Sequence, residues 1–123
     1  LAVDRNNARV ADLYHSLHPA VLQALAAVAE ASRAEGIPIG ICGELAGDPE
    51  GAVLLLAMGY DILSMNATSL PKVKKALRNV HLSEARDLLR EVMDLDTAAA
   101  VHLRLEQFLT EHGMEKFIHN PVE

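Results

Sequence analysis

The 123-residue sequence predicts an α/β protein that is rich in helix and has two or three short parallel strands. Two short apolar runs, Ile37–Cys42 and Asp61–Asn66, are separated by a helical stretch, and this alternation is typical of parallel βα units. Around them, apolar residues recur at helical spacing. Half of the residues are hydrophobic and 23% are charged, so a folded core is expected rather than disorder.

In the first third of the chain, prolines and glycines predict where the helix boundaries lie. Leu1–Val3 reads as the tip of a strand that runs into a polar loop, and Ala8–His15 can be helical. Pro19 suits the first position of a helix because its fixed φ matches and its missing N–H costs nothing there. Gly36 is expected to end that helix in the left-handed conformation.

The two apolar runs read as strands, and helices are expected between and after them. Ile37–Cys42 is short, apolar and rich in β-branched residues, as a strand buried on both faces in a parallel sheet is, and Asp61–Asn66 reads as a second short strand. Four helices are expected: one that starts at Asp48-Pro49 and ends at Gly59, one over Leu70–Val80 capped by Ser69, one from Ser83 to about Leu95, and one from Asp96 or Thr97 to Gly113.

Charge and composition argue against several classes of protein. The formal net charge of −6 disfavours nucleic-acid binding, which needs lysine and arginine against the phosphates. No apolar run approaches the roughly 20 residues that span a bilayer, and no secretory signal pattern is visible. The single cysteine cannot form an internal disulfide, which fits a reducing compartment. We therefore expect a cytoplasmic location.

Cys42 is the first candidate for chemistry. Free cysteine is usually a small buried hydrophobe, but Cys42 closes an apolar run, and active sites lie at the carboxyl ends of parallel strands. Gly43 would let a ligand approach the backbone closely, and Glu44 could anchor the turn or contact a substrate. A thiol there could act as a nucleophile or as an acid. Free thiols have a pKa of about 8.5, so at neutral pH most of them still hold a proton to donate.

Arg5 is the second candidate. A lone arginine is usually a solvated loop residue, yet Arg5 follows a strand tip and would share a rim with Cys42. Its guanidinium could bind phosphate or carboxylate oxygens in pairs. Asn6 and Asn66 could reach the same rim.

Two further clusters, one of histidines and one of basic residues, are most simply explained as ordinary surface residues. His15 and His18, with Asp12 before them, superficially resemble a metal site, but Pro19 breaks the helix that they would need to share a face. The sequence therefore predicts no metal ligands here. Four basic residues lie on the helix expected at Leu70–Val80: Lys72, Lys74, Lys75 and Arg78. The simplest interpretation is a solvated helix face, and the more specific alternative is a docking patch for an acidic partner.

Five segments carry a resemblance to a known family: LAVDRNN (Leu1–Asn7), SLHPAVL (Ser16–Leu22), GICGELAGDP (Gly40–Pro49), LLLAMGYDILSMNA (Leu54–Ala67) and LPKVKKALRN (Leu70–Asn79). They resemble the C-terminal end of enzyme I of the phosphoenolpyruvate-dependent phosphotransferase system. The resemblance runs from Leu1 to about Leu95 and is strongest to the nitrogen-system paralogue. Pyruvate phosphate dikinase and phosphoenolpyruvate synthase share the same barrel and are the alternative, but Leu45-Ala46 after Glu44 favours enzyme I.

The resemblance implies the C-terminal part of a (β/α)8 TIM barrel that binds phosphoenolpyruvate and magnesium. It implies that the phosphoryl group passes to a histidine on an N-terminal domain and then to a small phosphocarrier protein, with release of pyruvate. Cys42 matches the cysteine that protonates enolpyruvate, and Arg5 matches a phosphate-binding arginine. Gly43 and Glu44 match the turn on the substrate side.

The resemblance also implies what this chain lacks. It places the magnesium ligands, the other phosphate-binding arginines and the phosphorylated histidine before Leu1. Because a complete barrel takes about 250 residues, residues 1–123 are expected to supply only its last two to three βα units and to be inactive alone. The family dimerises through its barrel domain, so the second hypothesis for the isolated chain is a non-catalytic dimerisation module.

Overall fold

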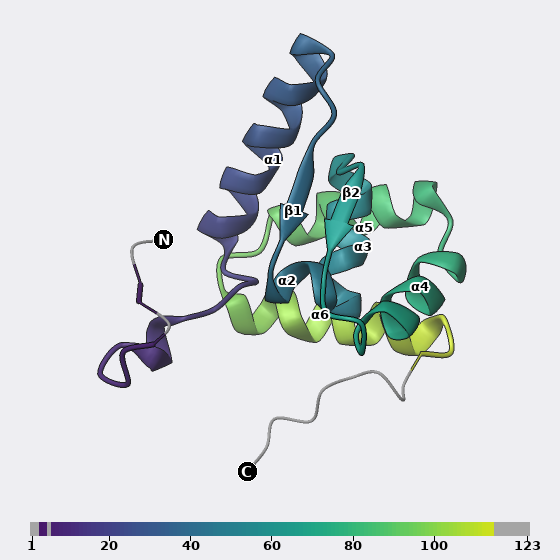
Figure 1. Cartoon of the computed structure of the whole chain (residues 1–123). Helices are drawn as coiled ribbons and strands as arrows, with labels where there is room; N and C mark the ends of the chain where they lie inside the picture. Colours follow the sequence, from purple (N-terminus) through teal and green to yellow (C-terminus); the bar gives the residue numbers. More distant parts are fainter. Residues whose placement is uncertain (1–2, 5, 115–123) are drawn as a thin grey trace.

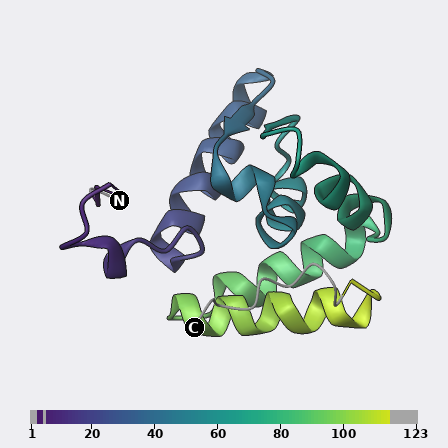
Figure 2. The ribbon, with the colours of Figure 1, turned by 60° about the horizontal axis from the view of Figure 1, so that its bottom comes forward.

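The computed structural model describes residues 3–4 and 6–114, and helices dominate them (Figure 1). An N-terminal segment with one short 3₁₀ turn, η1 (Ala11–Leu13), projects from the remaining elements (Figures 1 and 2). The predominance of helices and the presence of two parallel strands confirm the predicted helix-rich α/β architecture. The other elements follow in the order α1 (Pro19–Glu35), β1 (Gly40–Cys42), α2 (Glu44–Gly47), α3 (Pro49–Met58), β2 (Ile62–Ser64), α4 (Leu70–Arg78), α5 (Leu82–Met93) and α6 (Ala98–Glu111).

β1 and β2 pair in parallel, and they form the two-stranded sheet of the described residues. The register places Ile41 opposite Leu63, and these two side chains are half-buried against the helical core. The residues on either side of them are exposed: Gly40, Cys42, Ile62 and Ser64. One face of the sheet is therefore covered by helices, and the other face is open.

α3 is the centre of the core, since all of its residues except Leu56 are buried. α1, α4, α5 and α6 pack against it, and Figure 2 shows α5 and α6 side by side along one side of the molecule. α1 is tied to the end of α3 by the Tyr60 hydroxyl, which donates to the Leu25 carbonyl at 3.1 Å, and by Arg33, which donates to the Met58 carbonyl at 2.8 Å. The largest fully buried side chains are Leu22, Val53, Leu54, Leu55, Leu88, Val92, Val101, Leu105, Leu109 and Met114.

The proline and glycine signals correctly predicted most helix boundaries. α1 begins at Pro19 and ends at Gly36, which has φ 65°. The Asp48 side chain caps α3 by accepting a hydrogen bond from the Glu50 N–H, and Gly59 ends the helix with φ 96°. Thr97 caps α6 by accepting a hydrogen bond from the backbone N–H three residues later, at 3.2 Å.

Two predicted caps are wrong. Ser69 precedes α4 but its side chain makes no capping hydrogen bond; the Asn66 Oδ1 accepts from the Ser69 N–H instead, at 2.8 Å. α5 begins at Leu82, one residue before Ser83, and its N-cap is His81, whose N–H donates to the Glu84 carboxylate at 2.9 Å. That backbone hydrogen bond is also the main cause that lowers the pKa of Glu84.

The strand predictions were too long. The expected strand tip falls on Leu1–Val3, of which Leu1 and Ala2 lie outside the described residues and Val3 is in no strand. Within Ala8–His15 only η1 is helical. Among the residues that the structure describes, none of the helices combines the length and apolar composition that crossing a bilayer requires.

Candidate functional site

A cleft of about 840 Å³ opens at the carboxyl ends of β1 and β2, and we call it the strand-end cleft. Gly43 and Glu44 line it after β1, Ser64 and Asn66 line it at the end of β2, and Lys72 lines it from the first turn of α4. Parallel strands end at the same edge of a sheet, where ligands bind in open α/β folds. The cleft therefore lies where the sequence predicts a site.

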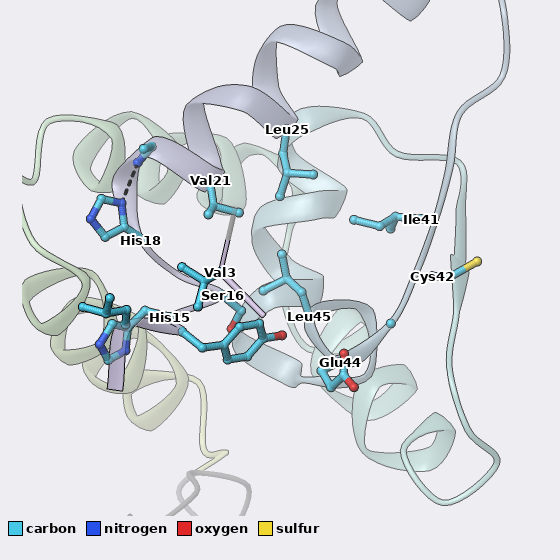
Figure 3. Close-up of a pocket in the computed structure, with 14 residues that line it drawn as sticks. Val3, His15, Ser16, His18, Val21, Leu25, Ile41, Cys42, Glu44 and Leu45 are labelled. Carbon is cyan, nitrogen blue, oxygen red and sulfur yellow. Dashed lines mark hydrogen bonds between the residues drawn. The ribbon is translucent and has the colours of Figure 1, made fainter. Parts of the chain in front are cut away.

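Cys42 is the last residue of β1 and pairs in register with Ser64. Its thiol is free and exposed. Figure 3 shows the Ile41 side chain pointing toward Leu25 and Leu45, whereas the Cys42 sulfur points away from them, on the opposite face of the strand. The thiol thus lies on the open face of the sheet, together with Ser64. Cys42 does not line the strand-end cleft; it lines a neighbouring apolar pocket, which is described below.

Gly43 makes the turn that follows the thiol. Its φ is 114° and its ψ is −169°, a region that is almost restricted to glycine. A Cβ built on Gly43 would meet nothing within 4 Å, so the backbone conformation requires glycine here and the available space does not. The turn lets α2 start at Glu44, directly after the strand.

Close packing holds α2 against α3. Leu45 and Ala46 are buried, and the carbonyl of Leu45 lies so close to Gly51 that a Cβ on Gly51 would be 2.4 Å from it. α2 also contacts both strands. The position of Glu44, which lines the strand-end cleft, is therefore set by packing beneath it rather than by the exposed surface.

A second cavity, an apolar pocket of about 500 Å³, lies between the N-terminal segment, α1 and β1 (Figure 3). Both His15 and His18 line it. The Nδ1 atom of His18 accepts a hydrogen bond from the Ala20 N–H at 3.1 Å, so this side chain caps α1. Within residues 3–4 and 6–114, no group of three or more His, Cys, Asp or Glu side chains could hold a metal ion.

The remaining candidates have different outcomes. Arg5 lies outside the described residues, so its predicted position on the rim stays a prediction. Asn6 belongs to the projecting N-terminal segment, and the strand-end cleft is not lined by it. Asn66 does line the cleft, and its Oδ1 accepts hydrogen bonds from the Ser69 N–H and the Thr68 hydroxyl, both at 2.8 Å.

Sequence reasoning missed several residues of the cleft, among them Ser64 and Lys72. Ser64 closes its strand as Cys42 closes the neighbouring one, and this equivalence was a usable signal. Lys72 was assigned to a solvated surface, because a sequence does not tell which side of a helix meets the end of a neighbouring strand.

Behind the cleft, Glu50 was also missed. It is only 4% exposed, and its carboxylate lies 2.7 Å from the Nδ1 of His102 on α6. Burial raises the pKa of Glu50, while the hydrogen bond to His102 acts in the opposite direction. No sequence signal predicts this burial, since acidic residues are common in the solvated first turn of a helix.

Comparisons with known proteins agree with this geometry. Residues 1–82 match the family described as "PEP-utilising enzyme, PEP-binding domain". A "Phosphoenolpyruvate-protein phosphotransferase" of Haemophilus influenzae is 45% identical over 114 residues, which are 93% of this chain and 20% of that protein. Proteins of Salmonella typhimurium and Escherichia coli, both named "Phosphoenolpyruvate-dependent phosphotransferase system", are 42% and 43% identical over 93% of this chain and 15% of their own length.

The chain spans no more than about a fifth of the length of these relatives. The family match covers two thirds of the chain, including β1, the glycine turn and β2. The resemblance to PEP-utilising enzymes is therefore confirmed, and the chain belongs to the family of PEP-binding domains of PEP-utilising enzymes.

Proposed function

We propose that the whole protein is a phosphoenolpyruvate-protein phosphotransferase of the enzyme I type, and that this chain supplies its proton donor, Cys42. The observation that carries the proposal is the free, exposed thiol at the carboxyl end of β1, directly before the glycine turn whose residues Gly43 and Glu44 line the strand-end cleft. The match to the PEP-binding family and the names of the relatives support it. We further propose a cytoplasmic enzyme of the nitrogen-system branch.

The proposed reaction balances as follows. A histidine nitrogen of another domain takes the phosphoryl group from phosphoenolpyruvate, and enolpyruvate remains. The methylene carbon of enolpyruvate then takes the proton of the Cys42 Sγ–H while the enolate oxygen becomes the keto oxygen of pyruvate. The thiolate regains a proton from water, and the phosphohistidine passes its phosphoryl group to a phosphocarrier protein. Arg5 is proposed to bind the phosphate of the substrate.

The described residues do not fit a magnesium site, because they hold no cluster of three or more candidate ligands. Magnesium therefore enters the proposal only as an ion held elsewhere in the whole protein, and no step is assigned to it here. With no metal-binding cluster among its described residues and with one candidate arginine, the isolated chain is expected to be inactive, since phosphoryl transfer depends on charge neutralisation. Pyruvate formation by the isolated chain with phosphoenolpyruvate, magnesium and phosphocarrier would contradict this expectation.

The proton-donor role is tested by Cys42→Ala in the whole protein. General acid catalysis contributes typically 10²–10⁴-fold, so pyruvate formation should slow by roughly that factor while the Kd for phosphoenolpyruvate changes by less than about threefold. Ser64→Ala is the matched control, because Ser64 pairs with Cys42 on the neighbouring strand and its loss should leave turnover within about tenfold of wild type. Normal turnover of Cys42→Ala would refute the acid role.

A second function, self-association, is favoured by the open face of the sheet. Ile62 is 58% exposed on that face, and each strand has one edge that no other described strand pairs. Unpaired strand edges and exposed apolar side chains promote association between chains. We propose that the isolated chain associates through this face and that the whole protein is a homodimer. Sedimentation over a concentration series tests the first part, and a clean monomer at high concentration would count against it.

A further inference from the structure

One face of α4 concentrates positive charge on an otherwise acidic chain. Four exposed basic residues occur within seven positions, and α4 contains no acidic residue. Val73 and Ala76, on the other side of the helix, are buried in the core, so the helix is held with this side outward. We call these four residues the basic face: Lys72, Lys74, Lys75 and Arg78.

The basic face is also hollowed. A groove of about 510 Å³ is lined by Pro71, Lys74, Lys75, Arg78 and Asn79. The Asn79 side-chain amide donates to the Lys75 carbonyl at 2.8 Å and closes the end of the helix beside the groove. The groove therefore has a fixed backbone and three cationic side chains around it.

The charges on this face repel one another. Lys74 and Arg78 are four residues apart, and Lys75 is three residues from both Lys72 and Arg78, so like charges are neighbours on the helix surface. In the part of the chain that the structure describes, no ion pair joins Lys72, Lys74 or Arg78 to a carboxylate.

α5 and α6 differ in this respect. Arg90 pairs with Asp87 on α5, and Arg104 on α6 pairs with Glu91 on α5 at 2.7 Å. Among the described residues no such pair compensates Lys72, Lys74 or Arg78, and this points to an anionic partner for these three side chains that is supplied from outside the described residues.

We propose that the basic face of α4 is a docking surface for an acidic protein surface. The face extends over six residue steps, which is about 9 Å at 1.5 Å per residue, and this length matches two turns of a facing helix with acidic residues at similar spacing. Lys72 lies at one end of the face and also lines the strand-end cleft. A partner docked on α4 would thus stand at the mouth of that cleft.

Nucleic acid fits the face less well than protein does. The rest of the chain has seven Lys and Arg residues against 17 Asp and Glu residues, which repel an extended polyanion. A strip of about 9 Å reaches few phosphates, and affinity for nucleic acid comes from many of them. α4 also has no aromatic residue on which a base could stack.

The test uses the full chain, labelled with ¹⁵N, and an 18-residue helical peptide with glutamates at i, i+3, i+4 and i+7. At low salt the peptide should shift amide resonances confined to residues 70–79 of the chain. Lys74→Glu should raise the Kd at least tenfold, and Arg86→Glu, the same charge change on the exposed side of α5, should raise it less than twofold. Raising the ionic strength should weaken binding, because salt screens exposed charges.

A charge exchange provides the sharper test. The double variant Lys74→Glu/Arg78→Glu should no longer bind the acidic peptide. It should bind a matching lysine peptide with a Kd at least tenfold lower than that of wild type. Three outcomes would overturn the proposal: no amide shifts at millimolar peptide, equal effects of Lys74→Glu and Arg86→Glu, or tighter binding of a 20-mer thymidine oligonucleotide than of the peptide. The third outcome would assign the face to nucleic acid instead.

Discussion

Gly51→Ala tests whether the close contact between α2 and α3 holds the wall of the strand-end cleft. A Cβ at Gly51 would lie 2.4 Å from both the carbonyl oxygen and the Cδ1 of Leu45, a separation that real Cβ atoms essentially never show. The leucine side chain could rotate away, but the carbonyl is backbone and can move only if α2 moves. The contact therefore predicts a large cost for a single added methyl group.

The size of that cost follows from two opposing terms. Overpacking a core typically costs about 1–3 kcal/mol, and the upper end applies because the obstacle is backbone. Alanine is favoured over glycine in helices by at most about 1 kcal/mol, which offsets part of it. The net loss in the free energy of unfolding is then about 2 kcal/mol, which lowers the Tm by roughly 6–10 °C for a chain of this size.

Urea unfolding followed by circular dichroism measures this loss as a lower midpoint at unchanged m-value. Gly40→Ala is the control, because its Cβ would lie 3.3 Å from the Cβ of Ile62, a contact that a shift of a few tenths of an ångström relieves. Leu45→Ala/Gly51→Ala removes the side-chain clash and leaves the carbonyl clash, so it should not restore stability. If Gly51→Ala were as stable as wild type, the packing account of α2 would be wrong.

Two further predictions concern Gly43 and Glu50. Gly43→Ala should lower the free energy of unfolding by about 1–3 kcal/mol, because alanine would be strained at these backbone angles. Urea unfolding measures this loss, and a variant as stable as wild type would refute the requirement for glycine in this turn. Since burial raises the pKa of Glu50, the native state holds this proton more tightly than the unfolded state does, and stability falls as the pH rises from about 4.5. Glu50→Gln, which can keep a hydrogen bond to His102, should therefore gain stability relative to wild type as the pH rises above about 4.5, and a stability difference that does not change with pH would contradict this.

The elements that sequence reasoning predicted correctly depend on local chemistry. Pro19, Gly36 and Asp48 act through their own dihedral angles or hydrogen bonds, so the ends of α1 and the start of α3 could be deduced without knowing the rest of the fold. The strand lengths could not be deduced in this way, because a residue belongs to a strand only where a residue of the adjacent strand pairs with it. Ile39 shows the limit: its N–H donates to the Asp61 carboxylate at 2.8 Å, one residue before the ladder begins.

The same distinction applies to the site. Cys42 and Gly43 could be placed at a strand end and its turn because an apolar run followed by glycine is visible in the sequence. α2 was missed because a single turn of helix forms there only through the backbone angles of Gly43 and packing against Gly51. Glu50 was missed because its burial depends on α6, which lies some fifty residues away in the sequence.

If the whole protein contains the proposed barrel, the substitution Ile62→Thr should affect the stability of the isolated chain and of the whole protein differently. Ile62 is 58% exposed on the open face of the sheet, so Ile62→Thr should change the stability of the isolated chain by no more than about 0.5 kcal/mol and reduce its self-association. In a closed barrel the residues of this face point into a packed interior, where burying an isoleucine contributes about 1.5–3 kcal/mol. The same substitution should then cost the whole protein at least about 1.5 kcal/mol, measured as a lower midpoint of urea unfolding. A small effect in both proteins would mean that nothing covers this face, and the barrel assignment would fail even though the family assignment stands.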